Sequence, residues 1–204
     1  MTTEAPMSIR GRAAIVGVGE LKPTRHTEGE TTLTMLARAG LLAVEDAGMS
    51  LGEVDGLLTQ PLPETQMLAP STMIEFLGVR ANFAEVVDLG GATGAGMVWR
   101  AAAAIAAGLC RTCLCLTGAT REQRPGGGRM GWGGMRDNSP YGEFEVPYGA
   151  IGANFGYAQV AMRYAYEYVS KPEQLAKIAV DQRHNACANP DAMFHGQPIT
   201  IEDV

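Results

Sequence analysis

The chain has 204 residues, of which 46% are apolar and 19% charged, and its formal net charge is −6 at pH 7. This length suits one ordinary domain, or a large domain with an excursion, and the apolar fraction is ample for a core. The acidic balance argues against a nucleic-acid groove, no apolar stretch is long enough to span a membrane, and residues 1–12 lack an apolar signal core, so we expect a cytoplasmic protein.

Alternating strand and helix patterns fill the first 120 residues. Short apolar stretches predict four β-strands, at residues 13–20, 54–60, 84–89 and 112–119. Apolar residues at helical spacing predict a helix over residues 33–44, with Gly48 as its C-cap. Ser71 is placed to cap a short second helix, and residues 94–107 predict a third. The order β-α-β-α-β-α-β favours an α/β fold with a mostly parallel sheet.

The third predicted helix, at residues 94–107, is apolar nearly all round. A helix of this kind is buried inside a protein rather than laid on its surface. An ordinary two-faced α/β sheet leaves one side of each helix exposed. We therefore expect further protein to cover this helix.

The character of the sequence changes after Thr120. Residues 121–149 are rich in glycine and show little periodicity, and a plain disordered loop is the alternative to an ordered segment. The aromatic residues Trp132, Tyr141, Phe144 and Tyr148 favour an ordered segment that lines a pocket. We expect a first domain at residues 1–120 and a loop domain at residues 121–204.

The loop domain is expected to contain two helices, at residues 150–170 and 171–189. Ser170 and Glu173 have the spacing of a capping box for the second one. Thr200 and Asp203 have the spacing of another helix start, just before the sequence ends at Val204.

Three of the four cysteines form a C-x-x-C-x-C pattern, at Cys110, Cys113 and Cys115. The last two fall on one face of a predicted strand, and no second ligand cluster with zinc-finger spacing is present. Buried cysteine behaves as a small apolar residue. We interpret these residues as core cysteines and expect no metal.

The glycine turn "GGATGAGM", at residues 90–97, joins the third predicted strand to the apolar helix. A phosphate-binding P-loop would need Lys and Ser or Thr after Gly96, but Met97 and Val98 stand there. A dinucleotide fingerprint would need glycine where Trp99 stands. The remaining interpretation is a nucleophile at a helix N-terminus, where the helix dipole lowers a thiol pKa.

At this turn the sequence resembles the thiolases, in particular their sterol-carrier-protein and lipid-transfer-protein branch. Gly91, Ala92, Thr93 and Gly94 match that branch's C-A-T-G or C-S-S-G, and "SKPEQLAKIAVDQRHNACANPDAMFHGQPITIEDV" matches a later stretch. The resemblance covers nearly all of the chain. It implies a five-layered αβαβα sandwich, of which this chain supplies the first βαβαβαβ half plus a loop domain and stops before the second half.

Two departures from the thiolase pattern concern catalysis. The acyl-accepting cysteine of the family falls on Gly91, which has no nucleophile. The second half, which carries the family's catalytic histidine and second cysteine, lies outside these residues, and we interpret His184 and His195 as surface or structural side chains. We therefore expect no catalytic residue in this chain and no activity from it alone.

One subgroup of this branch also lacks the cysteine, and it resembles this chain in "GGATGAG", "GYAQVAMRYAY" and "NPDAMFHGQPITIEDV". Its members cleave the carbon–carbon bond of β-hydroxyacyl-CoA by retro-aldol chemistry in sterol side-chain degradation. They are dimers that work with a small partner protein of oligonucleotide-binding-like fold. The resemblance implies an acyl-CoA substrate, no cofactor, substrate contacts from Gly91, Ala92, Thr93 and Tyr148, and a base and acid from the second half.

Two alternatives remain open. The first is an acetyl-CoA acyltransferase, the ordinary thiolase activity, which the glycine at position 91 argues against. The second is a non-catalytic, thiolase-like scaffold or lipid-binding subunit that pairs with another chain supplying the second half.

Overall fold

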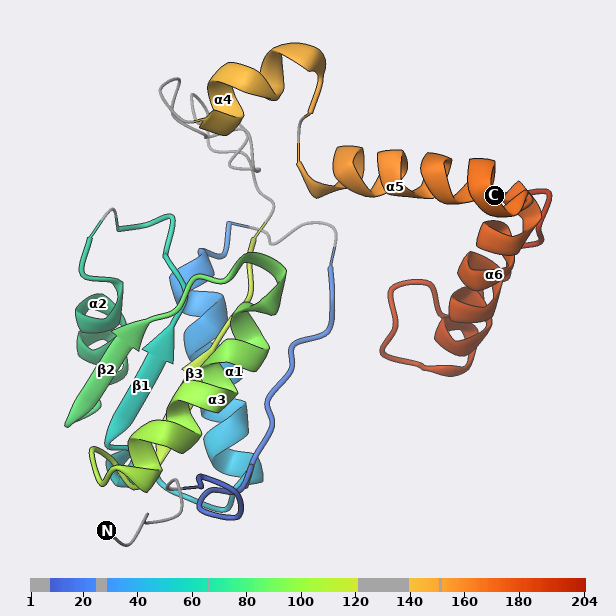
Figure 1. Ribbon diagram of the computed structural model, residues 1–204. Helices are drawn as coiled ribbons and strands as arrows, with labels where there is room; N and C mark the ends of the chain where they lie inside the picture. The colour runs from blue at the N-terminus through green and yellow to red at the C-terminus, as the bar shows by residue number, and fades with distance from the viewer. Residues whose placement is uncertain (1–7, 25–28, 66, 121–139, 151) are drawn as a thin grey trace, which may run out of the picture. The chain divides into compact units, whose positions relative to one another are not determined.

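The computed structural model of the chain describes residues 8–24, 29–65, 67–120, 140–150 and 152–204. The chain divides into two compact units (Figure 1). The first unit comprises Met1–Leu21 and Arg25–Arg121, and the second comprises Lys22–Thr24 and Glu122–Val204. The domain boundary predicted after Thr120 lies one residue from the end of the first unit.

A small parallel sheet forms the centre of the first unit. Its strands are β1 (Gly56–Thr59), β2 (Phe83–Val86) and β3 (Cys113–Leu116), in the order β2-β1-β3. In the central strand, Leu57 pairs with Ala84 on one side and with Leu114 on the other. All four residues of β1 are buried, as expected for a parallel strand covered on both faces. Three of the four predicted strands are confirmed, each shorter than predicted.

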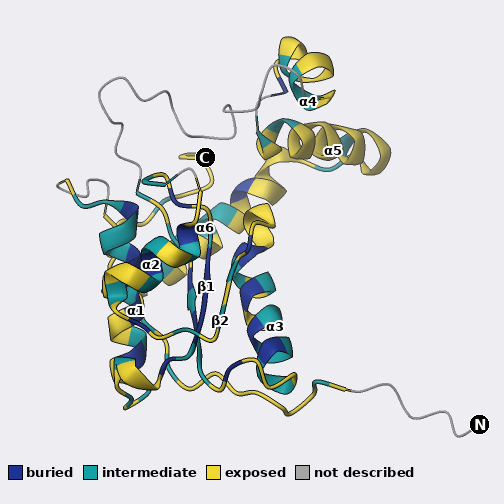
Figure 2. Cartoon of the chain, turned by 90° about the vertical axis from the view of Figure 1, so that its left-hand side faces the viewer, coloured by how far each residue is buried: buried dark blue, intermediate teal, exposed yellow. Residues whose placement is uncertain are grey.

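Helices cover both faces of this sheet. Figure 2 shows α1 (Thr32–Asp46) and α2 (Ala69–Leu77) on one side of the strands and α3 (Thr93–Ala106) on the other. The alternation of β1 explains this arrangement, because successive side chains point to opposite faces. Leu57 belongs to a core with side chains of α1 and α2, whereas Leu58 packs with Met97 and Ala101 of α3. The first unit is therefore a three-layer α/β/α structure.

The strand predicted at residues 13–20 is wrong. Within the described residues this segment is extended, but no backbone hydrogen bond joins it to the sheet. It lies instead against α1, where a Cβ atom on Gly17 would come within 2.2 Å of the Ala43 carbonyl oxygen, and one on Gly19 within 2.1 Å of that of Ala39. The two glycines allow this close approach, and the apolar side chains of the segment stay exposed.

The apolar helix α3 is buried on one face only within the described residues. Its buried side chains are Thr93, Met97, Ala101 and Ala104, whereas Trp99 is 63% exposed. The expected second cover is therefore not supplied by this part of the chain. The start of α2 also differs from the prediction: Leu68, with a left-handed φ of 60°, precedes the helix, so Ser71 lies inside it.

The second unit is helical, with α4 (Pro140–Phe144), α5 (Ala153–Tyr168) and α6 (Pro172–Ala188). The backbone N–H of Lys171 donates to Gln174 Oε1 over 2.9 Å, so the capping box lies one residue later than the predicted Ser170–Glu173 pair. The Thr200 backbone N–H bonds Asp203 Oδ2 at 2.8 Å, which is the expected pairing, but residues 201–204 form a turn and not the start of a helix. Trp132 lies outside the described residues. In the part of the chain that the structure describes, no helix is long and apolar enough to cross a membrane.

Candidate functional site

The carboxyl ends of the three parallel strands lie at one end of the first unit, where α3 begins (Figure 1). The chain leaves β2, passes through a 3₁₀ turn at Gly90–Ala92 and enters α3 at Thr93. Ligands of open α/β sheets bind at this edge, outside the carboxyl ends of the strands. The turn singled out in the sequence therefore stands where such a site is expected.

Hydrogen bonds within the turn hold its backbone in place. The Thr93 hydroxyl donates to the Gly90 carbonyl oxygen over 2.7 Å and accepts from the Leu89 N–H over 3.0 Å. Gly90 has a left-handed φ of 56°, which favours glycine. Thr93 is only 8% exposed, so its hydroxyl fixes the turn. Direct contact of Thr93 with a substrate stays a prediction.

Gly91 stands in open space. A Cβ atom at this position would meet nothing within 4 Å, and its φ lies outside the left-handed region. Gly91 and Ala92 are both exposed. Neither the backbone nor the packing of the described residues therefore requires glycine at position 91, and the space in front of it is free.

The start of α3 can donate hydrogen bonds into this space. The Ala92 and Thr93 N–H groups already donate to the Leu89 and Gly90 carbonyl oxygens of the preceding 3₁₀ turn. The first N–H groups of an α-helix have no partner within the helix, and no side chain caps α3 at Ala92, so the N–H groups after Thr93 in the first turn are the ones that could face a ligand. The helix dipole also favours negative charge at this end. An anionic or enolate oxygen in front of Gly91 and Ala92 would be stabilised both by N–H donors of the first turn and by the helix dipole.

Polar side chains that follow β1 and β3 meet beside this turn. Gln60 Oε1 accepts from the Thr117 hydroxyl over 2.9 Å and from the Gly118 N–H over 3.0 Å. Thr117 also lies next to α3, because a Cβ atom on Gly94 would stand 3.6 Å from Thr117 Cγ2. Sequence reasoning missed Gln60 and Thr117. The available signal was that each polar residue directly follows a buried strand.

A carboxylate that sequence reasoning also missed is Glu64, in the loop after β1. Its Oε1 accepts from the Thr32 N–H over 2.6 Å at the start of α1. Its Oε2 is buried and has no hydrogen-bond partner among the described residues. Glu64 thus places an acceptor near the N-terminus of α1, at the same end of the sheet.

Tyr148 belongs to the second unit, in the 3₁₀ turn Val146–Tyr148. Its side chain is 81% exposed. Its contact with a substrate stays a prediction. His184 and His195, also in the second unit, are exposed, which agrees with their interpretation as surface residues.

The cysteines lie away from the turn. Cys110 is buried at the far end of α3, and a 14-residue helix separates its two ends by about 21 Å. Cys113 and Cys115 lie half-buried in β3. The hydrogen bond between their thiols lowers the pKa of Cys115, and that bond together with burial raises the pKa of Cys113. Among the described residues, no three metal-ligating side chains come together.

Comparison of the chain with known proteins finds similarity to an aldolase and to a CoA lyase. No family model matches it. It is 31% identical over 201 residues to a steroid side-chain-cleaving aldolase of Thermomonospora curvata. The aligned residues cover 95% of this chain and 49% of that protein. It is 30% identical over 206 residues to the 17-hydroxy-3-oxo-4-pregnene-20-carboxyl-CoA lyase of Mycobacterium tuberculosis, covering 96% of this chain and 50% of that one.

The fold of the chain is also similar to that of a solved aldolase structure. The Ltp2-ChsH2(DUF35) aldolase matches with a TM-score of 0.76 and 29% identity, over 93% of this chain and 47% of that chain. The chain spans about half the length of the relatives it matches.

Proposed function

We propose that this chain is part of a lyase that cleaves the carbon–carbon bond of β-hydroxyacyl-CoA thioesters by a retro-aldol reaction, on substrates of the sterol side-chain type. The observation that carries the proposal is the free space at Gly91, at the start of a helix and without a nucleophile. The activities named for the two relatives, an aldolase and a CoA lyase, support the same reaction class.

The proposed reaction needs no acyl-enzyme. A base removes the proton of the β-hydroxyl group, and the bond between the hydroxyl carbon and the α-carbon breaks. The hydroxyl carbon becomes a ketone or an aldehyde, and the electron pair moves to the α-carbon and the thioester oxygen as an enolate. A proton delivered to the α-carbon completes a shortened acyl-CoA. No electron acceptor and no cofactor are required.

The turn would contribute enolate stabilisation and space. Hydrogen-bond donors aimed at a developing oxyanion stabilise a transition state strongly, and the N–H groups at the start of α3 would serve here. The absence of a side chain at Gly91 leaves room for a branched carbon skeleton. The Thr93 hydroxyl would hold the turn in place, and Tyr148 would donate to the thioester oxygen. We assign the base and the acid to the half of the assembly outside this chain. We further propose that the assembly is a homodimer that works with a small partner protein of oligonucleotide-binding-like fold.

The two other activities are less well supported. Acyl transfer by a thiolase needs a thiolate at the turn, and Cys110 is buried at the far end of α3. A role as a non-catalytic scaffold agrees with the missing nucleophile, but it does not explain why the chain is similar to an aldolase and a lyase. Product analysis distinguishes the three, because only the lyase releases a ketone or an aldehyde.

The test combines this chain with the part of the Thermomonospora curvata aldolase that it does not match, and with a small partner protein of that system. The assembly is incubated with a β-hydroxyacyl-CoA whose hydroxyl carbon is fully substituted, and ketone release is measured. We expect release by the wild-type chain. Gly91→Val should lower kcat/KM by about 10- to 100-fold, because the branched side chain fills the free space.

Three control variants separate a filled site from a damaged fold. Ala95→Val adds the same side chain to an exposed position of α3 and should keep the activity. In urea unfolding, Gly91→Ala should stay within about 0.5 kcal/mol of the wild type, whereas Gly90→Ala should lose about 1 kcal/mol because of its left-handed φ. Absence of ketone from an assembly that forms would reject the lyase proposal, and CoA-dependent acyl transfer by the wild type would favour the thiolase.

A further inference from the structure

Two glycines of the first turn of α3 accept side chains from the loops on either side. Gly94 lies against Thr117, which follows β3, because a Cβ atom at position 94 would stand 3.6 Å from Thr117 Cγ2. Gly96 lies against Leu89, in the turn after β2, and a Cβ atom there would come within 2.4 Å of Leu89 Cδ1. The start of the helix is therefore held between two side chains, which approach its backbone closely because glycine carries no side chain.

Gln60, the residue after β1, fixes Thr117 in turn. Its Nε2 donates to the Gly118 carbonyl oxygen, and its Oε1 accepts from the Gly118 N–H over 3.0 Å. The same Oε1 accepts from the Thr117 hydroxyl over 2.9 Å. The N–H and the carbonyl group of Gly118 together determine which end of the carboxamide is the oxygen, so the Thr117 hydroxyl must be the donor. Gln60 thus holds both the backbone and a side chain of the segment after β3.

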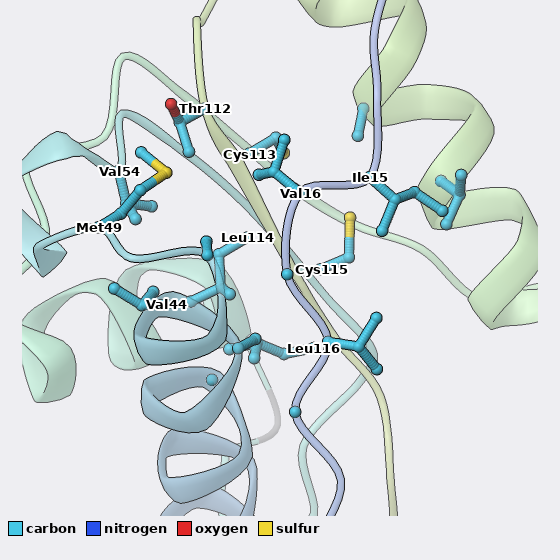
Figure 3. A pocket seen from close by; sticks show the side chains of 18 of the residues that line it. Ile15, Val16, Val44, Met49, Val54, Thr112, Cys113, Leu114, Cys115 and Leu116 are labelled. Carbon is cyan, nitrogen blue, oxygen red and sulfur yellow. The ribbon is translucent and has the colours of Figure 1, made fainter.

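Thr117 stands where the chain leaves the apolar surroundings of β3. Side chains of β3 such as Cys115 and Leu116 line an apolar cavity of about 690 Å³ beside the sheet (Figure 3), and Thr117 is the next lining residue along the chain. Gln60 gives its hydroxyl a partner on the side of β1. The hydroxyl and the methyl group share one Cβ atom, so fixing the first also fixes the second. The methyl group is therefore kept against Gly94.

The turn of α3 held in this way is the one whose N–H groups after Thr93 could face the space at Gly91. Hydrogen-bond donors stabilise a developing oxyanion best when they are already aimed at it, because no reorganisation is then needed during the reaction. A misplacement of about 1 Å can cost a rate on the order of 100-fold. Gln60 can therefore affect this site without touching a substrate.

We propose that Gln60 is a positioning residue of this site: through Thr117 it keeps the first turn of α3 aligned with the oxyanion that forms in front of Gly91. The inference rests on the proposed function, which makes this oxyanion an enolate. Because the enolate charge develops in the transition state, loss of alignment lowers kcat more than it raises KM. A residue that only stabilised the fold would affect the binding of charged and neutral ligands alike.

The test uses the same assembly of this chain with the Thermomonospora curvata polypeptide and the small partner protein, and two CoA thioethers that a retro-aldol reaction cannot cleave. Carboxymethyl-CoA carries an anionic oxygen near the sulfur, and S-isobutyl-CoA is a neutral counterpart of the same shape. We expect the wild type to bind carboxymethyl-CoA about tenfold more tightly in calorimetry, because only this ligand can accept from the N–H donors. Gln60→Met should remove most of this preference and leave the affinity for S-isobutyl-CoA within about twofold of the wild type.

Kinetics and two further variants make the test specific. With the substrate whose hydroxyl carbon is fully substituted, Gln60→Met should lower kcat about tenfold and leave KM within about twofold. Gln182→Met makes the same replacement at an exposed position of α6 and should match the wild type. Thr117→Val keeps the shape of the side chain but loses the hydrogen bond to Gln60, and should lower the preference about threefold. This variant decides the question if circular dichroism shows that Gln60→Met does not fold.

Three results would overturn the proposal. These are no preference for carboxymethyl-CoA in the wild type, an undiminished preference in the folded variants of Gln60 and Thr117, and an equal loss of both ligands in Gln60→Met, which would mark a purely structural residue. Failure of the lyase proposal looks different. Loss of the preference in Gln60→Met, in an assembly that releases no ketone, would reject the lyase and leave Gln60 as a positioning residue of an oxyanion site. Ketone release that Gln60→Met leaves unchanged would reject the positioning role and leave the lyase standing.

Discussion

At the scale of single residues, Gly56 illustrates how packed cysteine side chains can exclude any side chain from a neighbouring position. A Cβ atom on Gly56 would lie 2.8 Å from Cys110 Sγ and 3.2 Å from Cys113 Sγ. Gly56→Ala should therefore destabilise the chain, by about 1–3 kcal/mol, as overpacking of a tight core does. The measurement is the midpoint of urea unfolding, with an unchanged slope taken as evidence that unfolding remains two-state.

Removal of the facing sulfur provides the matched test. In the double variant Gly56→Ala with Cys110→Ala, the added methyl group enters space that the thiol has left, so the two losses should not add. We expect an interaction energy of about 1 kcal/mol from the double-mutant cycle. Strict additivity would mean that the thiol does not exclude a side chain from position 56.

The glycine turn shows the limits of reasoning from one position. The sequence singled out Gly91 because a nucleophile was expected there, and the structure places it exposed at the start of α3. The glycine that the backbone requires is its neighbour Gly90, whose φ is 56°. A left-handed φ depends on the path of the turn, which a run of two glycines does not reveal.

At the scale of elements, Asp55 connects the start of β1 to the segment before β3. Its Oδ1 accepts from the Arg111 N–H over 2.8 Å and from the Thr112 N–H over 2.9 Å. Burial acts to raise the pKa of this carboxyl, but the hydrogen bonds from Thr112 and Arg111 outweigh it, so the pKa lies below its usual value of 3.8. The charged form is therefore favoured by folding.

This lowered pKa makes part of the free energy of unfolding depend on pH. Because the folded pKa lies below the unfolded one, the contribution of Asp55 is complete above about pH 4 and is lost as the pH falls through the folded pKa. Asp55→Asn should cost about 0.5 kcal/mol at pH 7, a small value because the group is partly solvated, and the gap to the wild type should narrow below pH 4. Urea unfolding at pH 7, 4 and 3 measures it. A gap that is constant over this range would contradict the assigned role.

The sequence predicted the elements whose partners are close along the chain. Helix α1 and helix α3 were placed within about two residues of their ends, because apolar spacing and flanking glycines are local signals. The strand at residues 13–20 was wrong because strand pairing depends on an edge that another segment must supply. Ile15 and Val16 have strong β-propensity, but propensity does not provide a neighbour.

The same limit applies to the candidate site. Residues 91–93 could be named as candidates because they adjoin one helix start, and their contact with a substrate stays a prediction. Gln60 and Thr117 were missed because they meet only when β1 lies next to β3 in the sheet. Glu64 was missed because its partner is the backbone N–H of Thr32, 32 residues away along the chain. Contacts set by sheet order cannot be read from spacing.

At the scale of the whole molecule, burial is unevenly divided between the two units. The first contains two buried clusters on the two faces of its sheet, which include the fully buried side chains of Leu57 and Leu58. In the second, α5 has no buried residue and α6 has one, Ala176. Helices of this length are marginal in water unless tertiary packing supports them.

Local stability should follow this division. Amides open with free energies that depend on the apolar contacts holding them, from near zero at loose elements to the global value in a core. We therefore expect the amides of Leu57 and Leu58 to exchange at least 100-fold more slowly than those of α5, measured by hydrogen exchange of the chain alone at neutral pH. Intrinsic rates calculated for each sequence position are the control. Equal protection in α5 and β1 would contradict the prediction, because it would require α5 to bury an apolar face against a partner that the described residues do not supply.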